Sequence, residues 1–146
     1  MKKTLIISLL VAAMGMITFM GCKKHNLESP SLPNTSWRLI AFVGNGVSTP
    51  VDYGYKTNSF TINFKNNRKW DGVSSSNHME GKYSVSNHNV KIEISLTTEI
   101  SETKDGLKFV DKLGKVTSYV SASNQLRLDI DENESLLFER IQQWKS

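Results

Sequence analysis

The residue with the most distinctive chemistry in the sequence is Cys22, the only cysteine among 146 residues. It follows Gly21 at the end of an uncharged, mostly apolar run over residues 5–20, and two lysines precede that run. A positive start, an apolar run and a small residue at the cut are the three parts of a secretory signal. The sequence therefore predicts that residues 1–21 are an export signal that is cut between Gly21 and Cys22.

The four residues Phe19-Met20-Gly21-Cys22 resemble a lipobox, the motif at which lipoprotein signal peptidase cuts just before a diacylated cysteine. The glycine fits this motif, whereas Phe19 stands where leucine is commoner. Because two acyl chains make a stable membrane anchor, we expect the mature chain to be lipid-anchored in the cell envelope, on the outer membrane of a Gram-negative bacterium. The alternative is a retained membrane-spanning helix, which usually needs about 20 predominantly apolar residues.

His78 and Glu80 are candidates for catalysis or metal binding, because they lie two residues apart and would share one face of a β-strand. A zinc site would need a third protein ligand, and the spacing identifies none. An envelope hydrolase or metal-dependent enzyme that uses His78 and Glu80 is therefore the alternative hypothesis. The chain contains no Gly-x-Ser-x-Gly elbow, and the sequence assigns no catalytic residue, metal site or cofactor.

A second group of interest combines the aromatic side chains of Tyr53, Tyr55 and Trp70 with the carboxylate of Asp71. These four residues could form a hydrogen-bonding patch for a glycan or a peptide if the long early loop folds over the strand that carries Trp70. The alternative is that the rings pack in the core or at a sheet edge, as aromatic side chains in small β domains more often do.

The charge balance of the predicted mature chain argues against a nucleic-acid partner. Removal of residues 1–21, which hold two of the 18 basic side chains, leaves 125 residues with 16 basic and 14 acidic groups. This small excess is no electrostatic footprint for nucleic acid. The expected partners are the membrane, through lipid on Cys22, and an envelope protein, peptide or glycan, and a non-catalytic interaction module is the favoured function.

The mature chain is expected to consist of a tether and one domain. Residues 22–33 are polar, contain two prolines and show no apolar period, so they predict a flexible tether. Residues 34–146 are long enough for a single hydrophobic core, and 43–55 is expected to be a turn-rich connection. Alternating apolar and polar positions predict strands over 36–42, 60–64, 69–73, 79–85, 90–94, 116–120, 126–130 and 135–140.

One segment of the domain has a helical rather than an alternating period. Phe109 and Leu113 lie four residues apart, with Asp105 available as N-cap and Gly114 as C-cap. The segment predicts a short helix that packs Phe109 and Leu113 on the sheet. The expected fold class is α+β, a mainly antiparallel β sheet or partly open barrel with one short helix packed on it.

The order of these landmarks resembles the META domain, also called HslJ-like, a family of small bacterial exported domains. The resemblance is carried by Leu32-Pro33-Asn34-Thr35-Ser36-Trp37, Phe60-Thr61-Ile62-Asn63-Phe64, Asn77, Gly81-Lys82-Tyr83, Thr97-Thr98, Glu102, Phe109, Leu113, Val116, Tyr119, Leu126-Arg127-Leu128 and Leu137-Phe138. The family often has a cysteine where this chain has Ser76, and another after the threonine pair where this chain has none. The resemblance implies a compact, mostly antiparallel β fold with one helix, an exported or lipid-anchored location, a loose association with envelope stress and no established catalytic mechanism.

Replacement of the predicted lipidated cysteine tests the anchor directly. In a bacterial host, the wild-type chain should be recovered in the membrane fraction with the mass of a diacylated chain that starts at residue 22. Cys22→Ala should abolish the lipid increment and release the protein from that fraction in a high-salt wash, because the chain then carries no acyl groups to insert in the bilayer. An uncleaved or soluble wild-type chain, measured by intact mass and fractionation, would contradict the prediction.

Overall fold

The computed structural model describes residues 31–142, except for the side chains of residues 96 and 97. The predicted signal peptide, the cleavage and lipidation site at Gly21-Cys22 and tether residues 22–30 lie outside the described residues. Within residues 31–142, no helix is long and apolar enough to cross a membrane.

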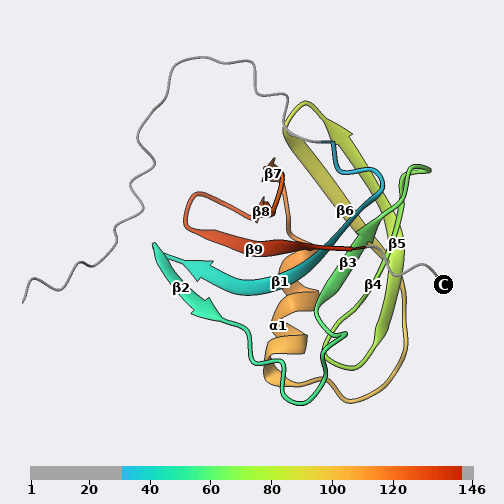
Figure 1. Cartoon of the computed structure of the whole chain (residues 1–146), viewed down its shortest axis with the longest axis vertical. Coiled ribbons are helices and arrows are strands. Elements are labelled where there is room, and N and C mark those ends of the chain that lie inside the picture. The colour runs from blue at the N-terminus through green and yellow to red at the C-terminus, as the bar shows by residue number, and fades with distance from the viewer. Residues whose placement is uncertain (1–30, 143–146) are drawn as a thin grey trace, which may run out of the picture.

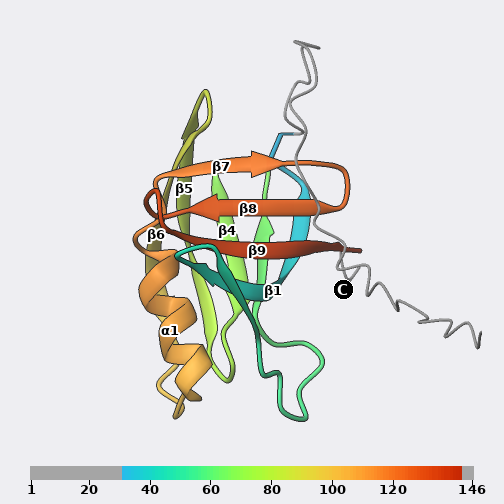
Figure 2. The ribbon, with the colours of Figure 1, turned by 90° about the vertical axis from the view of Figure 1, so that its left-hand side faces the viewer.

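The described chain forms one antiparallel sheet whose strands close into a ring (Figures 1 and 2). The strand order is β2-β1-β3-β4-β5-β6-β7-β8-β9, and the ring closes because β1 also pairs with β9. In Figure 2, β7, β8 and β9 cross the direction of β4, β5 and β6 at a steep angle. The elements are β1 Thr35–Gly44, β2 Val47–Pro50, β3 Thr61–Phe64, β4 Lys69–Val73, β5 His78–Ser86, β6 Asn89–Thr97, α1 Lys104–Leu113, β7 Ser118–Ser121, β8 Gln125–Asp129 and β9 Glu134–Ile141.

β1 is the strand that joins the two ends of the sheet. Its first half pairs with β3, its second half pairs with β2, and β9 pairs with it along the other edge. The change of partner falls at a β-bulge between Leu39 and Ala41, where the N–H of Leu39 donates to Phe60 and the carbonyl of Ile40 accepts from Val51. A bulge bends a strand locally, so β1 can pair with both β3 and β2 along the same edge.

The interior of the ring is apolar because alternate residues of each strand point inward. Trp37, Ile62, Leu126 and Phe138 are all fully buried. α1 covers one end of this core (Figures 1 and 2) and contributes Phe109, whose ring centroid lies 5.9 Å from that of Phe60 and 6.2 Å from that of Phe138. The core also contains Leu32, Leu39, Phe42, Val51, Phe64, Trp70, Met79, Tyr83, Val90, Ile92, Leu113, Val116, Tyr119, Leu128 and Leu136.

The fold confirms the predicted class and the predicted helix, with a different N-cap. Strands make up nearly all of the regular structure, and the single helix buries Phe109 and Leu113 as expected. Thr103 is the N-cap, and its side chain accepts a hydrogen bond from the N–H of Gly106. The prediction of Asp105 as N-cap is wrong, because this residue lies in the first turn, where its carboxylate accepts from the N–H of Asp52. Gly114 is the C-cap as predicted.

Most strand ends differ from the expected ones by a few residues, and three differences have a clear physical reason. The segment 43–55 contains the hairpin strand β2, which follows a turn at Asn45-Gly46 where both residues have positive φ. β3 starts at Thr61 because Phe60 has a left-handed backbone with φ 59°. Leu32 is buried in the core, so the packed part of the chain begins before Asn34, the boundary expected from the sequence.

Gly81 tests how tightly the sheet is packed around Trp70. It lies at a register shift in β5, opposite Trp70 on β4, and a Cβ atom there would collide with the carbonyl oxygen of Glu93 and lie 2.8 Å from Nε1 of Trp70. We expect Gly81→Ala to lower the free energy of unfolding by about 3 kcal/mol, the upper end of the usual cost of overpacking. Gly44→Ala is the matched control, because a Cβ there meets nothing within 4 Å. If urea unfolding shows that the two substitutions lower the free energy of unfolding equally, the close packing around Gly81 is contradicted.

Candidate functional site

The predicted aromatic patch is not a surface, because its central ring lies in the core. Trp70 is 1% exposed and its indole N–H donates to the carbonyl of Glu93 at 3.0 Å. Successive residues of a strand point to opposite faces, so Asp71 faces outward while Trp70 faces inward. The hydroxyl of Tyr53 donates to the carbonyl of Leu39 at 2.6 Å, and Tyr55 is fully exposed. The structure therefore does not bring Tyr53, Tyr55, Trp70 and Asp71 together as one binding surface.

The predicted pair His78 and Glu80 does share the outer face of β5, and both residues are exposed. Glu80 lies opposite Asp71 on β4 in the strand register. In the part of the chain that the structure describes, no group of three or more His, Cys, Asp or Glu side chains is arranged to hold a metal ion. Among the described residues, therefore, no third side chain joins His78 and Glu80 to form a metal site.

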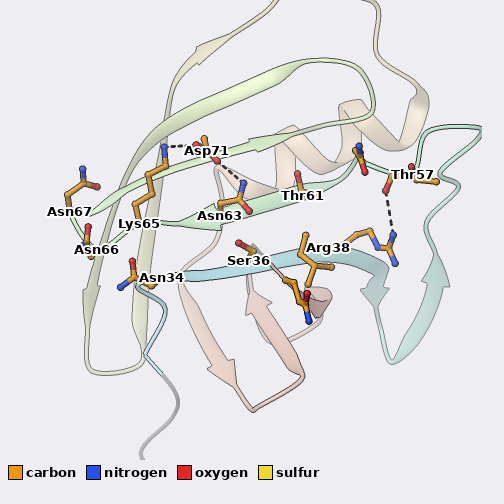
Figure 3. Close-up of a pocket in the computed structure, with 13 residues that line it drawn as sticks. Asn34, Ser36, Arg38, Thr57, Thr61, Asn63, Lys65, Asn66, Asn67 and Asp71 are labelled. Carbon is orange, nitrogen blue, oxygen red and sulfur yellow. Dashed lines mark hydrogen bonds and ion pairs between the residues drawn. The ribbon is translucent and has the colours of Figure 1, made fainter. Parts of the chain in front are cut away.

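A polar groove of about 720 Å³ lies on the outer face of β1, β3 and β4 (Figure 3). The strands put their outward residues there because each alternates with a buried one, as Ser36 and Arg38 flank Trp37 on β1. Asn63 comes from β3 and Asp71 from β4. The full lining is Asn34, Ser36, Arg38, Thr57, Asn58, Thr61, Asn63, Lys65, Asn66, Asn67, Asp71, Ile141 and Gln142.

Ser36 gives this groove its most distinctive feature. The residue is 2% exposed, and its hydroxyl has no hydrogen-bond partner within the described part of the protein. In the strand register it lies between Asn63 on one side and Ile141 on the other. A buried hydroxyl without a partner costs about 1–3 kcal/mol, so the wall of the groove contains an unsatisfied polar atom.

Charged side chains stand at both ends of the groove. Arg38 forms an ion pair with Glu139 at 2.5 Å, and Lys65 forms one with Asp71 at 2.5 Å. Partial burial by itself raises the pKa of Asp71, but hydrogen bonds from Lys65 and Asn63 together with nearby positive charge outweigh burial and hold that pKa below its ordinary value. The groove therefore offers cationic and anionic groups as well as neutral amides and hydroxyls.

Comparison with known proteins identifies the family. The model of the META domain matches residues 30–143. The chain belongs to the META domain family. The resemblance seen in the sequence is thus confirmed, and no match to a curated protein was found.

Solved structures share the fold of this META domain. An NMR structure of a protein from Burkholderia xenovorans has a TM-score of 0.63 and 20% identity, over 77% of this chain and 85% of that chain. A crystal structure of a DUF4847 family protein from Bacteroides vulgatus has a TM-score of 0.61 and 17% identity, over 77% of this chain and 96% of that chain. At these identities the likeness shows the fold alone, and neither description names an activity.

Asn77, Thr98 and Glu102, which all carry the family resemblance, meet beside the start of α1. Asn77 uses all four hydrogen-bonding positions of its amide. Its oxygen accepts from the N–H of Ile100 and the hydroxyl of Thr98, both at 2.7 Å. Its nitrogen donates to the carbonyl of Ile100 and the carboxylate of Glu102, both at 2.6 Å. This saturation indicates that the motif fixes the β4–β5 loop to the segment before the helix.

The carboxylate of Glu102 is the other centre of this network. It accepts hydrogen bonds from the hydroxyls of Ser74 and Ser75 and from the N–H of Ser75 at 3.2 Å. Gly106 packs so closely on Glu102 and Ser75 that a Cβ atom would overlap both. Partial burial by itself raises the pKa of Glu102, but the hydrogen bonds from Ser74, Ser75 and Asn77 outweigh burial and hold that pKa below its ordinary value.

The stability of this META domain should depend on Glu102 ionisation. Because the folded-state pKa lies below the ordinary value of 4.5, the stabilisation is fully present above about pH 4.5 and is lost as pH falls through the folded pKa. We expect Glu102→Gln to cost about 2 kcal/mol near pH 7, where it replaces a charged acceptor.

Urea unfolding at several pH values measures the loss of stability caused by Glu102→Gln. The difference in the free energy of unfolding between wild type and Glu102→Gln should shrink on acidification below about pH 4.5. The wild-type carboxyl then becomes neutral, as the amide of the variant is at every pH. Glu132→Gln, at an exposed turn, is the control and should follow the wild type. A gap for Glu102→Gln that stays constant down to about pH 3 would refute the role of its charge.

Proposed function

We propose that this protein is an exported lipoprotein, anchored through a diacylated Cys22 to the outer membrane, whose META domain is a non-catalytic binding module. The ligand site in this proposal is the groove on β1, β3 and β4. The single observation that carries the proposal is the buried hydroxyl of Ser36, which lines the groove without a partner. A bound polar group supplies that partner.

The chemistry of the lining favours a peptide as the ligand. Six of the thirteen lining residues are Asn or Gln, and their amides donate and accept like the backbone of an extended peptide. None of the thirteen is aromatic, whereas recognition of a sugar ring would be helped by an apolar ring face. Arg38 at one end and the Lys65–Asp71 pair at the other suit a ligand that carries both carboxylate and ammonium groups.

The same lining supports binding rather than catalysis. A serine nucleophile needs an adjacent base to activate it, and no histidine is among the residues that line the groove with Ser36. His78 and Glu80, the basis of the enzyme alternative, are not part of that lining either.

Ser36→Ala should separate stability from binding. The change removes an unpaired buried hydroxyl, so we expect the free energy of unfolding to rise by about 1 kcal/mol. The free peptide stem of peptidoglycan is the probe, titrated calorimetrically beside the disaccharide without its peptide. The wild type should bind the stem and not the disaccharide, and Ser36→Ala should weaken stem binding about tenfold, the value of one hydrogen bond.

Ser59→Ala is the matched control for this experiment. Ser59 is 1% exposed like Ser36, but its hydroxyl donates to the carbonyl of Lys56 at 2.9 Å. We expect its replacement to lower stability by about 1 kcal/mol, since a hydrogen bond is lost, and to leave stem binding unchanged. Absence of stem binding to the wild type, or equal binding by wild type and Ser36→Ala, would reject the groove as a peptide site.

A further inference from the structure

A basic hollow lies next to the polar groove, on the outer face of β4, β5 and β6. It measures about 260 Å³ and is lined by Asn67, Arg68, Lys69, Lys82, Tyr83, Ser84, Lys91 and Glu93. Four of these residues are cations and one is a carboxylate, so the hollow has a net charge of +3. Glu93 is already engaged in an ion pair with Lys91 at 2.8 Å.

Glu93 also lies opposite Lys82 in the β5–β6 register, so a single carboxylate faces the four cations of the hollow. Lys69 and Lys82 lie directly opposite each other in the β4–β5 register, and like charges at opposed positions destabilise a sheet. In the described part of the chain, neither these lysines nor Arg68 forms an ion pair. The arrangement therefore leaves a local repulsion that an external anion would relieve.

The excess charge is local and does not reflect a basic domain. Residues 31–142 contain 13 basic and 13 acidic side chains, so the +3 of the hollow is balanced elsewhere. Three carboxylates lie in and beside the β8–β9 turn, at Asp131, Glu132 and Glu134, and Glu134 pairs with the last residue of β1, Gly44. At about 3.3 Å per residue, the ten-residue strand separates its ends by up to roughly 30 Å. The end of β1 near the hollow, here called the basic end, therefore lies away from this turn, where Glu134 pairs with Lys112 of α1 at 2.6 Å.

The predicted tether enters the domain at the basic end. Asn34, just before β1, lines the same groove as Lys65, Asn66 and Asn67, and Figure 3 shows these residues gathered on one side. Asn67 lines the basic hollow as well. A chain of nine residues from Cys22 to Pro30 can span at most about 30 Å, so an anchor at Cys22 would keep this end near the membrane surface.

We infer that the basic hollow around Lys69 and Lys82 binds the phosphate groups of anionic phospholipids in the membrane that carries the anchor. This inference rests on the proposed lipid anchor, which supplies the proximity. Basic residues near an anionic bilayer gain from its negative surface potential, and the hollow has a net charge of +3. The lipid contact orients the anchored domain with its basic end on the membrane and the β8–β9 turn away from it.

Vesicle binding of the non-lipidated chain tests the hollow separately from the anchor. The mature chain with Cys22→Ser retains every described residue, and its partition into vesicles can be measured by sedimentation. The vesicles are phosphatidylcholine alone, or phosphatidylcholine with phosphatidylglycerol at about two to one, which supplies the anionic surface. We expect binding to the anionic vesicles only, and loss of binding as salt screens the charges.

Charge variants locate the contact. Lys69→Gln with Lys82→Gln should weaken the partition about 25-fold, since each lysine near an anionic surface contributes about fivefold. The control removes the same charge from exposed residues at the ends of α1, as Lys104→Gln with Lys115→Gln, and should change the partition less than about twofold. Equal losses in the two double variants, or equal binding to neutral and anionic vesicles, would overturn the inference. Loss of membrane association in Cys22→Ala after a high-salt wash, which screens the hollow, tests the anchor alone, so the two failures are distinguishable.

Discussion

The pairing of β1 with β9 is the interaction on which the rest of the structure depends. It joins the first and last strands of the domain through eight register pairs, from Ser36 with Ile141 to Gly44 with Glu134. Without it the sheet would have open edges at β1 and β9, and unpaired edges expose backbone N–H and C=O groups. The pairing on the opposite side of the ring is much shorter, because β6 and β7 share one register pair, Asn89 with Ser118. Closure of the ring is therefore secured where the first and last strands of the described domain pair.

This closure also creates the candidate site. Because both edges of β1 are paired, its alternate residues have fixed environments: Trp37 is held in the apolar interior, and Ser36 is held between Asn63 and Ile141 on the outer face. Ser36 is 2% exposed at the wall of the groove, and its hydroxyl has no partner among the described residues. The residues of the family motif serve a different purpose, since Asn77 and Glu102 are saturated by hydrogen bonds within the fold. In this domain the motif stabilises a loop beside the helix, while the groove has unused hydrogen-bonding capacity.

Much of the fold could be predicted because the spacing of apolar residues within each segment identifies strands and helices. Alternation predicted eight of the nine strands, and the spacing of Phe109 and Leu113 predicted the helix. The missed strand β2 had a usable signal, because Asn45-Gly46 is typical of a two-residue hairpin turn. The same period also argues against the aromatic patch: adjacent residues of a strand face opposite sides, so Trp70 and Asp71 cannot both lie on one surface.

The groove could not be predicted from local patterns, since Ser36 meets Asn63 and Asp71 only after β1 has paired with the β3–β4 hairpin, which comes much later in the chain. The most direct test of its role is to measure intermolecular nuclear Overhauser effects between isotope-labelled protein and the bound peptide stem. The account predicts contacts from the peptide to Ser36, Arg38 and Asn63. Contacts confined to the exposed pair His78 and Glu80, or a saturated complex without any contact at the groove, would contradict it.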